Sequence, residues 1–198
     1  DRYDLLRASS PYFAMKADME AETTRTAVEG MPVLIGNPSL CVDAYDPTPT
    51  TGKLLVAVAQ RRMPVYLPGV MNVVATRDVG EALVNAAVLG RTGQRYILGG
   101  DNTTARDFLG LVARIAGVPP PRVPVPIPLA EAMAYASEVV SLLRRRGWAA
   151  LPVSGVQMMK HSQAFDCKLA HAELQMPRTP IATAVADALR WLKENGYL

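Results

Sequence analysis

The chain has 198 residues, of which 49% are hydrophobic and 20% charged, and its formal net charge is +3. This composition is typical of a globular protein and excludes a disordered or fibrous one. A chain of this length buries about 70% of its unfolded surface on folding, so it needs no disulfide staples. No apolar run approaches the roughly 20 residues that cross a bilayer, and no signal-peptide pattern opens the chain. We therefore expect a cytoplasmic protein that binds no membrane.

The sequence does not predict a metal site, a disulfide or a nucleic-acid-binding surface. Cys41 and Cys167 are far apart, so two reduced thiols are expected. His161 and His171 have no flanking carboxylate or cysteine pattern, and no metal site is predicted. The pI is near 9.0. The main basic cluster, 144–146, lies at the end of a predicted helix without interleaved aromatic residues, so no nucleic-acid partner is expected.

The first quarter of the chain predicts a helix, a buried strand and a long loop. Ser10 can cap a helix that opens with a proline and ends at Gly30, which predicts a helix over 11–29. The run PVLIGN (32–37) is apolar on both faces, like a strand buried in a parallel sheet. The loop PSLCVDAYDPTPTTG (38–52) is long enough to be functional, and we place a domain boundary there.

Strand and helix patterns then alternate, which is typical of an α/β fold. The predicted elements are a helix in 53–62, strands at 65–69 and 71–75, a helix over 78–90 capped by Asp78, a strand at 95–100, a helix over 103–117 capped by Thr103 or Thr104, an extended proline-rich linker at 118–128, a helix over 128–146, a short helix capped by Asp166 and a final helix over 180–196.

Six stretches taken in order resemble the C-terminal half of an extended short-chain dehydrogenase/reductase, closest to the branch of dihydroflavonol-reductase-like proteins and nucleoside-diphosphate-sugar epimerases. They are SPYFAMKADMEAE, GNPSLCV, NVVATRDVGEALVNA, RYILGGDNTT, FDCKLAHAEL and ALRWLKENGYL. The resemblance implies an α/β fold with the C-terminal part of a Rossmann-type doubly wound sheet in 1–42. A smaller, mostly helical substrate-binding domain would follow in 43–198, with 72–99 able to return to the Rossmann sheet.

Tyr12 and Lys16 form the candidate catalytic pair. A spacing of four residues places both on one helix face about one turn apart, and an ammonium held there favours the phenolate form of a tyrosine. The resemblance implies that Tyr12 exchanges a proton with the hydroxyl or carbonyl of a small-molecule substrate during hydride transfer, while Lys16 also holds the nicotinamide ribose. The alternative interpretation is two surface residues that share a helix face.

The resemblance also implies contacts at the end of the next strand, where open α/β sheets bind their ligands. The predicted contacts with NAD or NADP are Tyr12, Lys16, Pro38, Ser39 and Cys41. The predicted substrate contacts are Asn37, Thr50, Thr51 and Gly52. The plain alternatives are a proline that only ends a strand and a threonine-rich stretch that is only a turn.

Two departures from the family pattern are visible. Related enzymes carry a His and two Asp residues in the strand-to-helix turn where this chain has Ala75, Arg77 and Asp78. Many nucleotide-sugar enzymes carry an arginine just before that strand, where this chain has Val70 and Met71. These departures argue against nucleotide-sugar binding.

The glycine-rich turn that binds the pyrophosphate has no counterpart in these 198 residues. The chain begins with Asp1 rather than Met, so we expect the remainder of a longer enzyme that is catalytically incomplete by itself. The residues that distinguish NAD from NADP would lie upstream. We also expect a homodimer through the 11–29 helix, which carries Phe13, Met15 and Met19 besides its catalytic face.

Two functions from different classes are consistent with these observations. The first is an NAD(P)-dependent reductase or epimerase. The second is a non-catalytic relative that senses a cofactor or binds a partner, and the altered turn at 75–78 keeps this alternative open.

Overall fold

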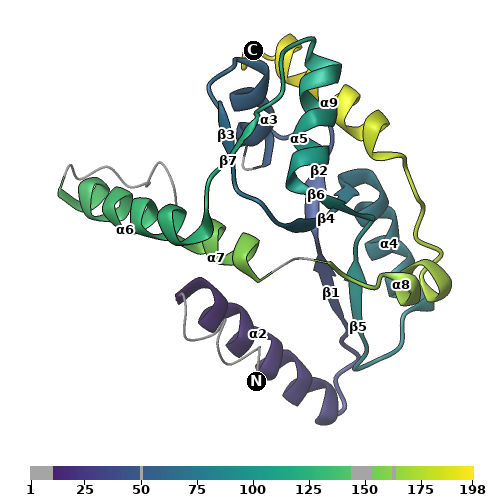
Figure 1. The fold of residues 1–198 in the computed structure, drawn as a ribbon. Helices are drawn as coiled ribbons and strands as arrows, with labels where there is room; N and C mark the ends of the chain where they lie inside the picture. Colours follow the sequence, from purple (N-terminus) through teal and green to yellow (C-terminus); the bar gives the residue numbers. More distant parts are fainter. Residues whose placement is uncertain (1–10, 50, 144–152, 162–163) are drawn as a thin grey trace.

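The computed structural model describes residues 11–49, 51–143, 153–161 and 164–198. Figure 1 shows the chain as a set of small sheets with helices packed around them. The elements are α2 (Pro11–Val28), β1 (Ile35–Pro38), β2 (Leu40–Val42), α3 (Thr51–Ala59), β3 (Val65–Tyr66), β4 (Val70–Ala75), α4 (Thr76–Leu89), β5 (Arg95–Leu98), β6 (Asp101–Thr104), α5 (Ala105–Ala116), β7 (Val123–Pro124), α6 (Ile127–Leu143), α7 (Val153–Lys160), α8 (Lys168–Glu173) and α9 (Ile181–Glu194).

β1 and β2 follow each other directly and pair with different neighbours. β1 runs parallel to β5, whereas β2 runs parallel to β4, which is antiparallel to β6. The change of partner occurs at Ser39, whose N–H still donates to the carbonyl of Leu98 at 3.1 Å. The expectation that 38–52 is all loop is therefore wrong at 40–42, because the apolar Leu-Cys-Val run completes a ladder with β4. It is also wrong at its two ends, because Pro38 is the last residue of β1 and 51–52 form the start of α3.

The mixture of helices with parallel strand pairs confirms the predicted α/β class. β5 lies within the segment 72–99 and pairs with β1, the strand expected to end the Rossmann part. A further short parallel pair joins β3 to β7, inside the stretch predicted to be an extended linker. The domain division at residue 42 stays a prediction.

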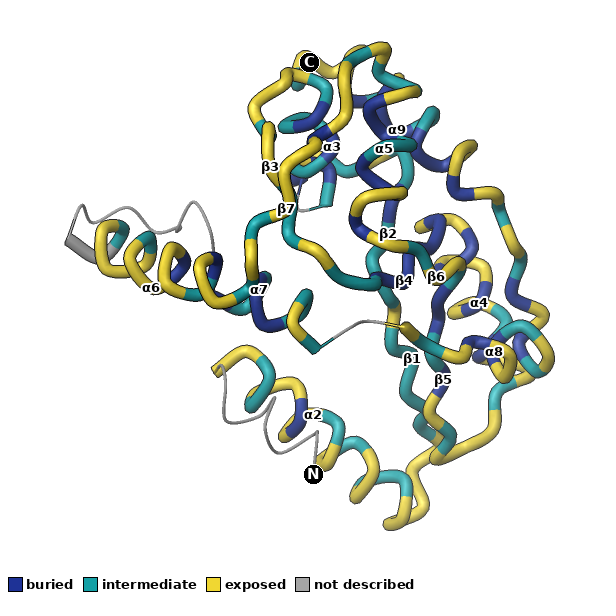
Figure 2. The backbone as a smooth tube through the Cα atoms, in the orientation of Figure 1, coloured by how far each residue is buried: buried dark blue, intermediate teal, exposed yellow. Residues whose placement is uncertain are grey.

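Three apolar clusters hold these elements together. The largest lies between β2, β4 and the helices α3, α5 and α9, and includes Phe108 and Leu55. A second joins β4 and β5 to α4 and α8 around Tyr96 and Leu174, and a third lies between α6 and α7 around Val156. Figure 2 shows these buried stretches and a contrasting, mostly exposed α2. Burying a side chain such as Phe108 contributes about 1.5–3 kcal/mol.

Several helix ends lie where the sequence predicts them. The Thr104 hydroxyl caps α5 by accepting the N–H of Asp107 at 3.1 Å, and Gly117 ends that helix with φ of +68°. Asp166 accepts the N–H of the first residue of α8 at 3.0 Å. α2 ends before Gly30, which has φ of +97°.

The predicted cap at Asp78 is wrong. α4 begins two residues earlier, so Asp78 lies in its first turn, where it is buried. Its carboxylate accepts the N–H and the hydroxyl of Thr179 at 2.7 and 2.6 Å. Ser10 and the basic cluster at 144–146 lie outside the described residues. Across the described ranges, no helix has both the length and the apolar character needed to span a bilayer.

Candidate functional site

The structure places Tyr12 and Lys16 on one face of α2, as the spacing predicts. The Lys16 Nζ lies over the Tyr12 ring, 5.8 Å from its centroid, within the range of a cation–π contact. The ring of Phe13 meets Tyr12 edge-on at 5.5 Å between centroids. Tyr12 is 45% exposed, so part of this residue lies at the surface. The shared face is confirmed, and the catalytic roles stay predictions.

α2 meets the rest of the fold near its C-terminal half. Glu20 forms an ion pair with Arg95 at the start of β5, and Ala17 is the residue of this helix that is buried. Met15 and Met19 are about half exposed. The apolar surface that a dimer through this helix would use is therefore present, and the dimer itself stays a prediction.

The predicted cofactor contacts on the strand lie at the junction of β1 and β2. Pro38 is exposed at the end of β1. The Ser39 hydroxyl oxygen is buried and has no hydrogen-bond partner among the described residues. Burial raises the pKa of the Cys41 thiol, which keeps this group neutral and makes it a poor nucleophile. Cys41 and Cys167 are both free thiols, as predicted.

The structure does not bring all the predicted residues together. Figure 1 shows the first turns of α2, which carry Tyr12 and Lys16, well separated from the junction of β1 and β2. Cys41 instead shares a cavity of about 180 Å³ with Thr51 and Gly52. Asn37 lies in β1 opposite Ile97 of β5. Thr50 lies outside the described residues.

Gly52 has a structural explanation. Its N–H donates to the Asp46 carboxylate at 3.2 Å at the start of α3. A Cβ at this position would lie 2.8 Å from that carboxylate and 2.9 Å from Pro49, so only glycine fits without a shift of the loop. The close packing of this loop therefore explains the glycine at position 52 without a role in substrate binding.

The predicted nicotinamide contacts are not gathered at one place. The exposed Lys16 ammonium on α2 can donate hydrogen bonds to the hydroxyl groups of a nicotinamide riboside, whereas the Ser39 hydroxyl oxygen at the junction is buried and is not accessible to a ligand in this structure. The pyrophosphate has no matching glycine-rich turn in this sequence.

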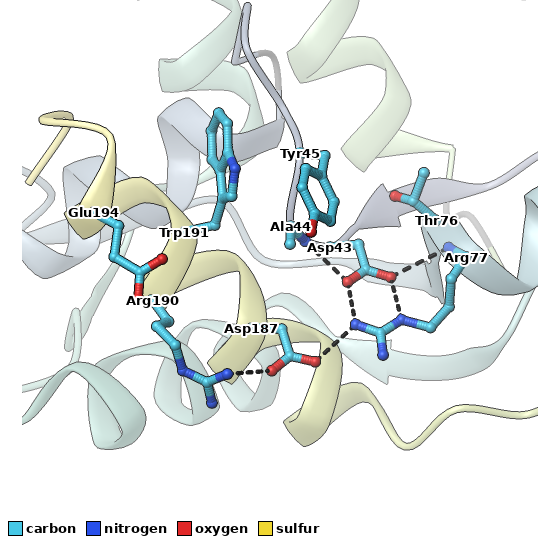
Figure 3. Close-up of a pocket in the computed structure, with 9 residues that line it drawn as sticks. All are labelled: Asp43, Ala44, Tyr45, Thr76, Arg77, Asp187, Arg190, Trp191 and Glu194. Carbon is cyan, nitrogen blue, oxygen red and sulfur yellow. Dashed lines mark hydrogen bonds and ion pairs between the residues drawn. The ribbon is translucent and has the colours of Figure 1, made fainter.

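A second polar site was not predicted from the sequence. Arg77, at the start of α4, donates from Nε and Nη2 to both carboxylate oxygens of Asp43 at 2.8 and 2.5 Å. The same guanidinium reaches Asp187 of α9 at 2.7 Å, and Asp187 also pairs with Arg190 at 3.2 Å. Figure 3 shows this chain of charges along a cavity of about 540 Å³, beside Trp191.

The Asp43 carboxylate is only 5% exposed, whereas Arg77 is 48% exposed. Burial alone would raise the pKa of Asp43, but hydrogen bonds from Arg77 and the Ala44 N–H outweigh it and hold that pKa below its ordinary value. The hydrogen bonds that Arg77 donates, first to Asp43 and then to Asp187, raise the pKa of Arg77. The site is thus a fixed, internally paired ion network. The sequence feature that could have indicated this network is Arg77, because it departs from the family pattern in the strand-to-helix turn.

A buried amide fixes the end of β5. Asn72 is 1% exposed, and its side chain donates to the Gly100 carbonyl at 3.0 Å and accepts the Gly100 N–H at 2.9 Å. A Cβ on Gly99 would lie 2.4 Å from the Asn72 amide oxygen and 2.5 Å from the Cys167 sulfur. The Gly-Gly pair in RYILGG therefore lets the chain pass close to β4, which is a structural role.

Comparisons with known proteins give a consistent set of relatives. No protein-family model matches the chain. A protein of Synechocystis sp. that has been given the name dihydroflavonol 4-reductase is 33% identical over 184 residues, which cover 90% of this chain and 53% of that protein. Sterol demethylase protein B of Methylococcus capsulatus is 28% identical over 191 residues, covering 94% of this chain and 58% of that protein. The chain thus spans a little over half the length of these relatives.

Solved structures similar to this chain come from the same kinds of protein. A nucleoside-diphosphate-sugar epimerase from Pseudomonas aeruginosa has a TM-score of 0.78 and 29% identity, with 96% of this chain and 57% of that one covered. A UDP-glucuronic acid 4-epimerase from Bacillus cereus, in complex with UDP-glucuronic acid and NAD, has a TM-score of 0.66 at 13% identity and covers 94% of this chain and 54% of that one. The second likeness shows the fold alone.

Proposed function

Because the chain belongs to the extended short-chain dehydrogenase/reductase family and matches the C-terminal half of its fold, we propose that it carries the acid/base pair and the substrate side of an NAD(P)-dependent reductase or epimerase. The observation that carries this proposal is the Lys16 ammonium held over the accessible ring of Tyr12. The substrate would be a small molecule with a hydroxyl or a carbonyl group.

When bound, the nicotinamide supplies the hydride. Tyr12 donates its phenolic proton to the substrate oxygen during reduction and takes it back in the reverse direction. The Lys16 ammonium, 5.8 Å from the centre of the Tyr12 ring, would offset the negative charge that develops on the phenolic oxygen during the transfer. Lys16, which is exposed on α2, would bind the ribose of the nicotinamide end.

Structures similar to this chain support a nicotinamide cofactor without selecting one. The Bacillus cereus epimerase is in complex with NAD. Another similar structure, RMD from Pseudomonas aeruginosa, is complexed with NADPH at a TM-score of 0.62 and 15% identity. We therefore propose NAD or NADP as the cofactor.

A second candidate function has its own observation. Arg77 occupies the strand-to-helix turn and is fixed between Asp43 and Asp187, which makes the turn a structural ion network. A non-catalytic relative that senses a cofactor or binds a partner would tolerate such a turn. The two candidates differ in whether the Tyr12 hydroxyl affects turnover.

The test is Tyr12→Phe in the full-length gene product, which removes only the phenolic hydroxyl. Turnover of dihydroquercetin with NADPH, or of UDP-glucose with NAD, should fall by on the order of 10²-fold or more, with nicotinamide affinity within about twofold of wild type. Tyr135→Phe is the matched control, since Tyr135 is 55% exposed on α6. A wild-type protein that binds the nucleotide and turns over neither substrate would support the non-catalytic candidate instead.

A further inference from the structure

A basic hollow of about 440 Å³ lies between the outer face of α5 and the proline-rich turn that follows this helix. Figure 1 shows the turn leading from the end of α5 back towards β7. Three arginines line the hollow: Arg106 and Arg114 of α5, and Arg122 of the turn. Asp107 is the acidic residue among the described lining residues, so three positive charges and one negative charge give the hollow a net charge of +2.

The spacing along α5 places its two arginines on one side of the helix. Positions 106, 110 and 114 recur every four residues, whereas Phe108 and Val112 of the same helix are buried in the largest apolar cluster. Gly110 lies midway between the arginines, and a Cβ added there would meet open space. The helix therefore leaves room for a ligand between two cationic side chains.

The turn that carries Arg122 is held in place by the chain around it. Gly117 ends α5 with φ of +68°, and the N–H of Val118 donates to the carbonyl of Ala113 at 2.9 Å. Pro121, whose ring fixes its φ, is buried directly before the arginine. Both walls of the hollow are therefore in position before a ligand binds, which reduces the entropy cost of binding.

The positive charges of the hollow are not neutralised within the described part of the chain. All three arginines are exposed, and none forms an ion pair with another described residue, unlike Arg77 and Arg91. The Asp107 carboxylate accepts the Thr104 hydroxyl at 2.6 Å in the cap of α5. Because like charges that share one hollow repel each other, an anion bound between them stabilises the site.

The lining distinguishes between kinds of anion. A guanidinium presents N–H donors in a planar fork that matches two oxygens of a phosphate group. The described lining residues include no aromatic side chain, so a nucleobase finds no ring on which to stack. A nucleic acid strand is bound by cations that follow a long stripe of surface, whereas these three arginines surround one hollow.

We propose that this hollow binds a small anion with two linked phosphate groups, which Arg106 and Arg114 contact from α5 and Arg122 contacts from the turn. The phosphate groups are the part that is recognised, whether the anion is free diphosphate or a nucleoside diphosphate. The inference involves neither Tyr12 nor hydride transfer, so it stands or falls apart from the proposed function.

The test is calorimetric titration of the 198-residue chain with sodium pyrophosphate. We expect a dissociation constant of about 0.1 mM at low salt, and an affinity that falls as sodium chloride is added. ADP should bind no more tightly than pyrophosphate, because the adenine has no ring to stack on. NADH should bind at least about tenfold more weakly, because its two phosphates are both esterified and carry less charge.

Two variants test the two walls separately. Arg114→Gln on the helix and Arg122→Gln on the turn should each weaken pyrophosphate binding by about tenfold, because each removes a charge-assisted pair of hydrogen bonds. Arg61→Gln is the matched control, since it removes the same charge from an exposed residue that does not line the hollow. It should change the affinity by less than about twofold.

Three results would overturn the inference. The first is the absence of pyrophosphate binding to the wild-type chain. The second is an equal loss of affinity in Arg61→Gln and in the two hollow variants, which would indicate a response to net charge alone. The third is tighter binding of ADP or of a single-stranded oligonucleotide than of pyrophosphate, with the same dependence on Arg114, which would indicate a nucleotide or nucleic-acid site.

Discussion

Removing the Arg77 side chain tests whether the ion network at the start of α4 stabilises the fold. Arg77→Ala deletes two hydrogen bonds to Asp43, at 2.8 and 2.5 Å, and one to Asp187 at 2.7 Å. The Asp43 carboxylate, 5% exposed, keeps the N–H groups of residue 77 and Ala44 as donors. Hydrogen bonds to charged groups contribute about 1.5–3 kcal/mol, and the half-exposed guanidinium is screened by solvent, so we expect a loss of about 2 kcal/mol.

For a chain of this length that loss lowers the melting temperature by about 4–8 °C. Thermal unfolding followed by circular dichroism measures it, with Arg190→Ala as the matched control. Arg190 also pairs with Asp187 but is 67% exposed, so its loss should cost less than about 0.5 kcal/mol. Equal melting temperatures for the two variants would refute this account of the network.

The same experiment has a pH dependence. The pKa of Asp43 is held below its ordinary value of about 3.9, so its contribution is present above that pH and is lost as the pH falls through the lowered pKa. The difference between wild type and Arg77→Ala should therefore narrow in acid. A stability difference between wild type and Arg77→Ala that grows towards low pH would contradict the role given to the ionised Asp43 carboxylate.

Three further outcomes are expected. Asn72→Ala leaves the N–H and carbonyl of Gly100 without their partner and should cost about 1–3 kcal/mol in chemical denaturation, whereas the exposed Asn195→Ala should be nearly neutral. Calorimetry of the 198-residue chain with NADH or NADPH should show no tight binding, and a micromolar dissociation constant would disprove this. Analytical ultracentrifugation should show a homodimer that Met15→Glu weakens and Val88→Glu, exposed on α4, does not; a monomeric wild type would end that prediction.

The sequence predicted those helices whose start, apolar periodicity and end are all marked by residues within the helix or next to it. α5 follows from its Thr104 cap, its apolar periodicity and the glycine at 117, and each of these signals lies within the helix or next to it. α2 and α9 were predicted from a proline at the start and a glycine after the end of each helix. The Tyr12 and Lys16 geometry was predictable for this reason too, since one helical turn fixes it.

What the sequence did not predict depends on distant partners. Asp78 looked like a cap, but it is bound by Thr179, 101 positions away. The pair of Asp43 and Arg77 spans 34 positions, and neither residue alone indicates the other. Likewise, Leu40–Val42 becomes a strand because β4 offers it a free edge. Tertiary contacts outweigh local preference at each of these positions.

A double-mutant cycle on Tyr12 and Lys16 in the full-length gene product tests the central claim most directly. The measurement is the turnover number of wild type, Tyr12→Phe, Lys16→Met and the double variant on one accepted substrate. If Lys16 acts through the Tyr12 phenolate, the double variant should be about as slow as the slower single variant, because residues that act as a unit are strongly non-additive. If the fold-losses in turnover of the two single variants multiply in the double variant, or if all four turnover numbers are equal, the two residues only share a helix face.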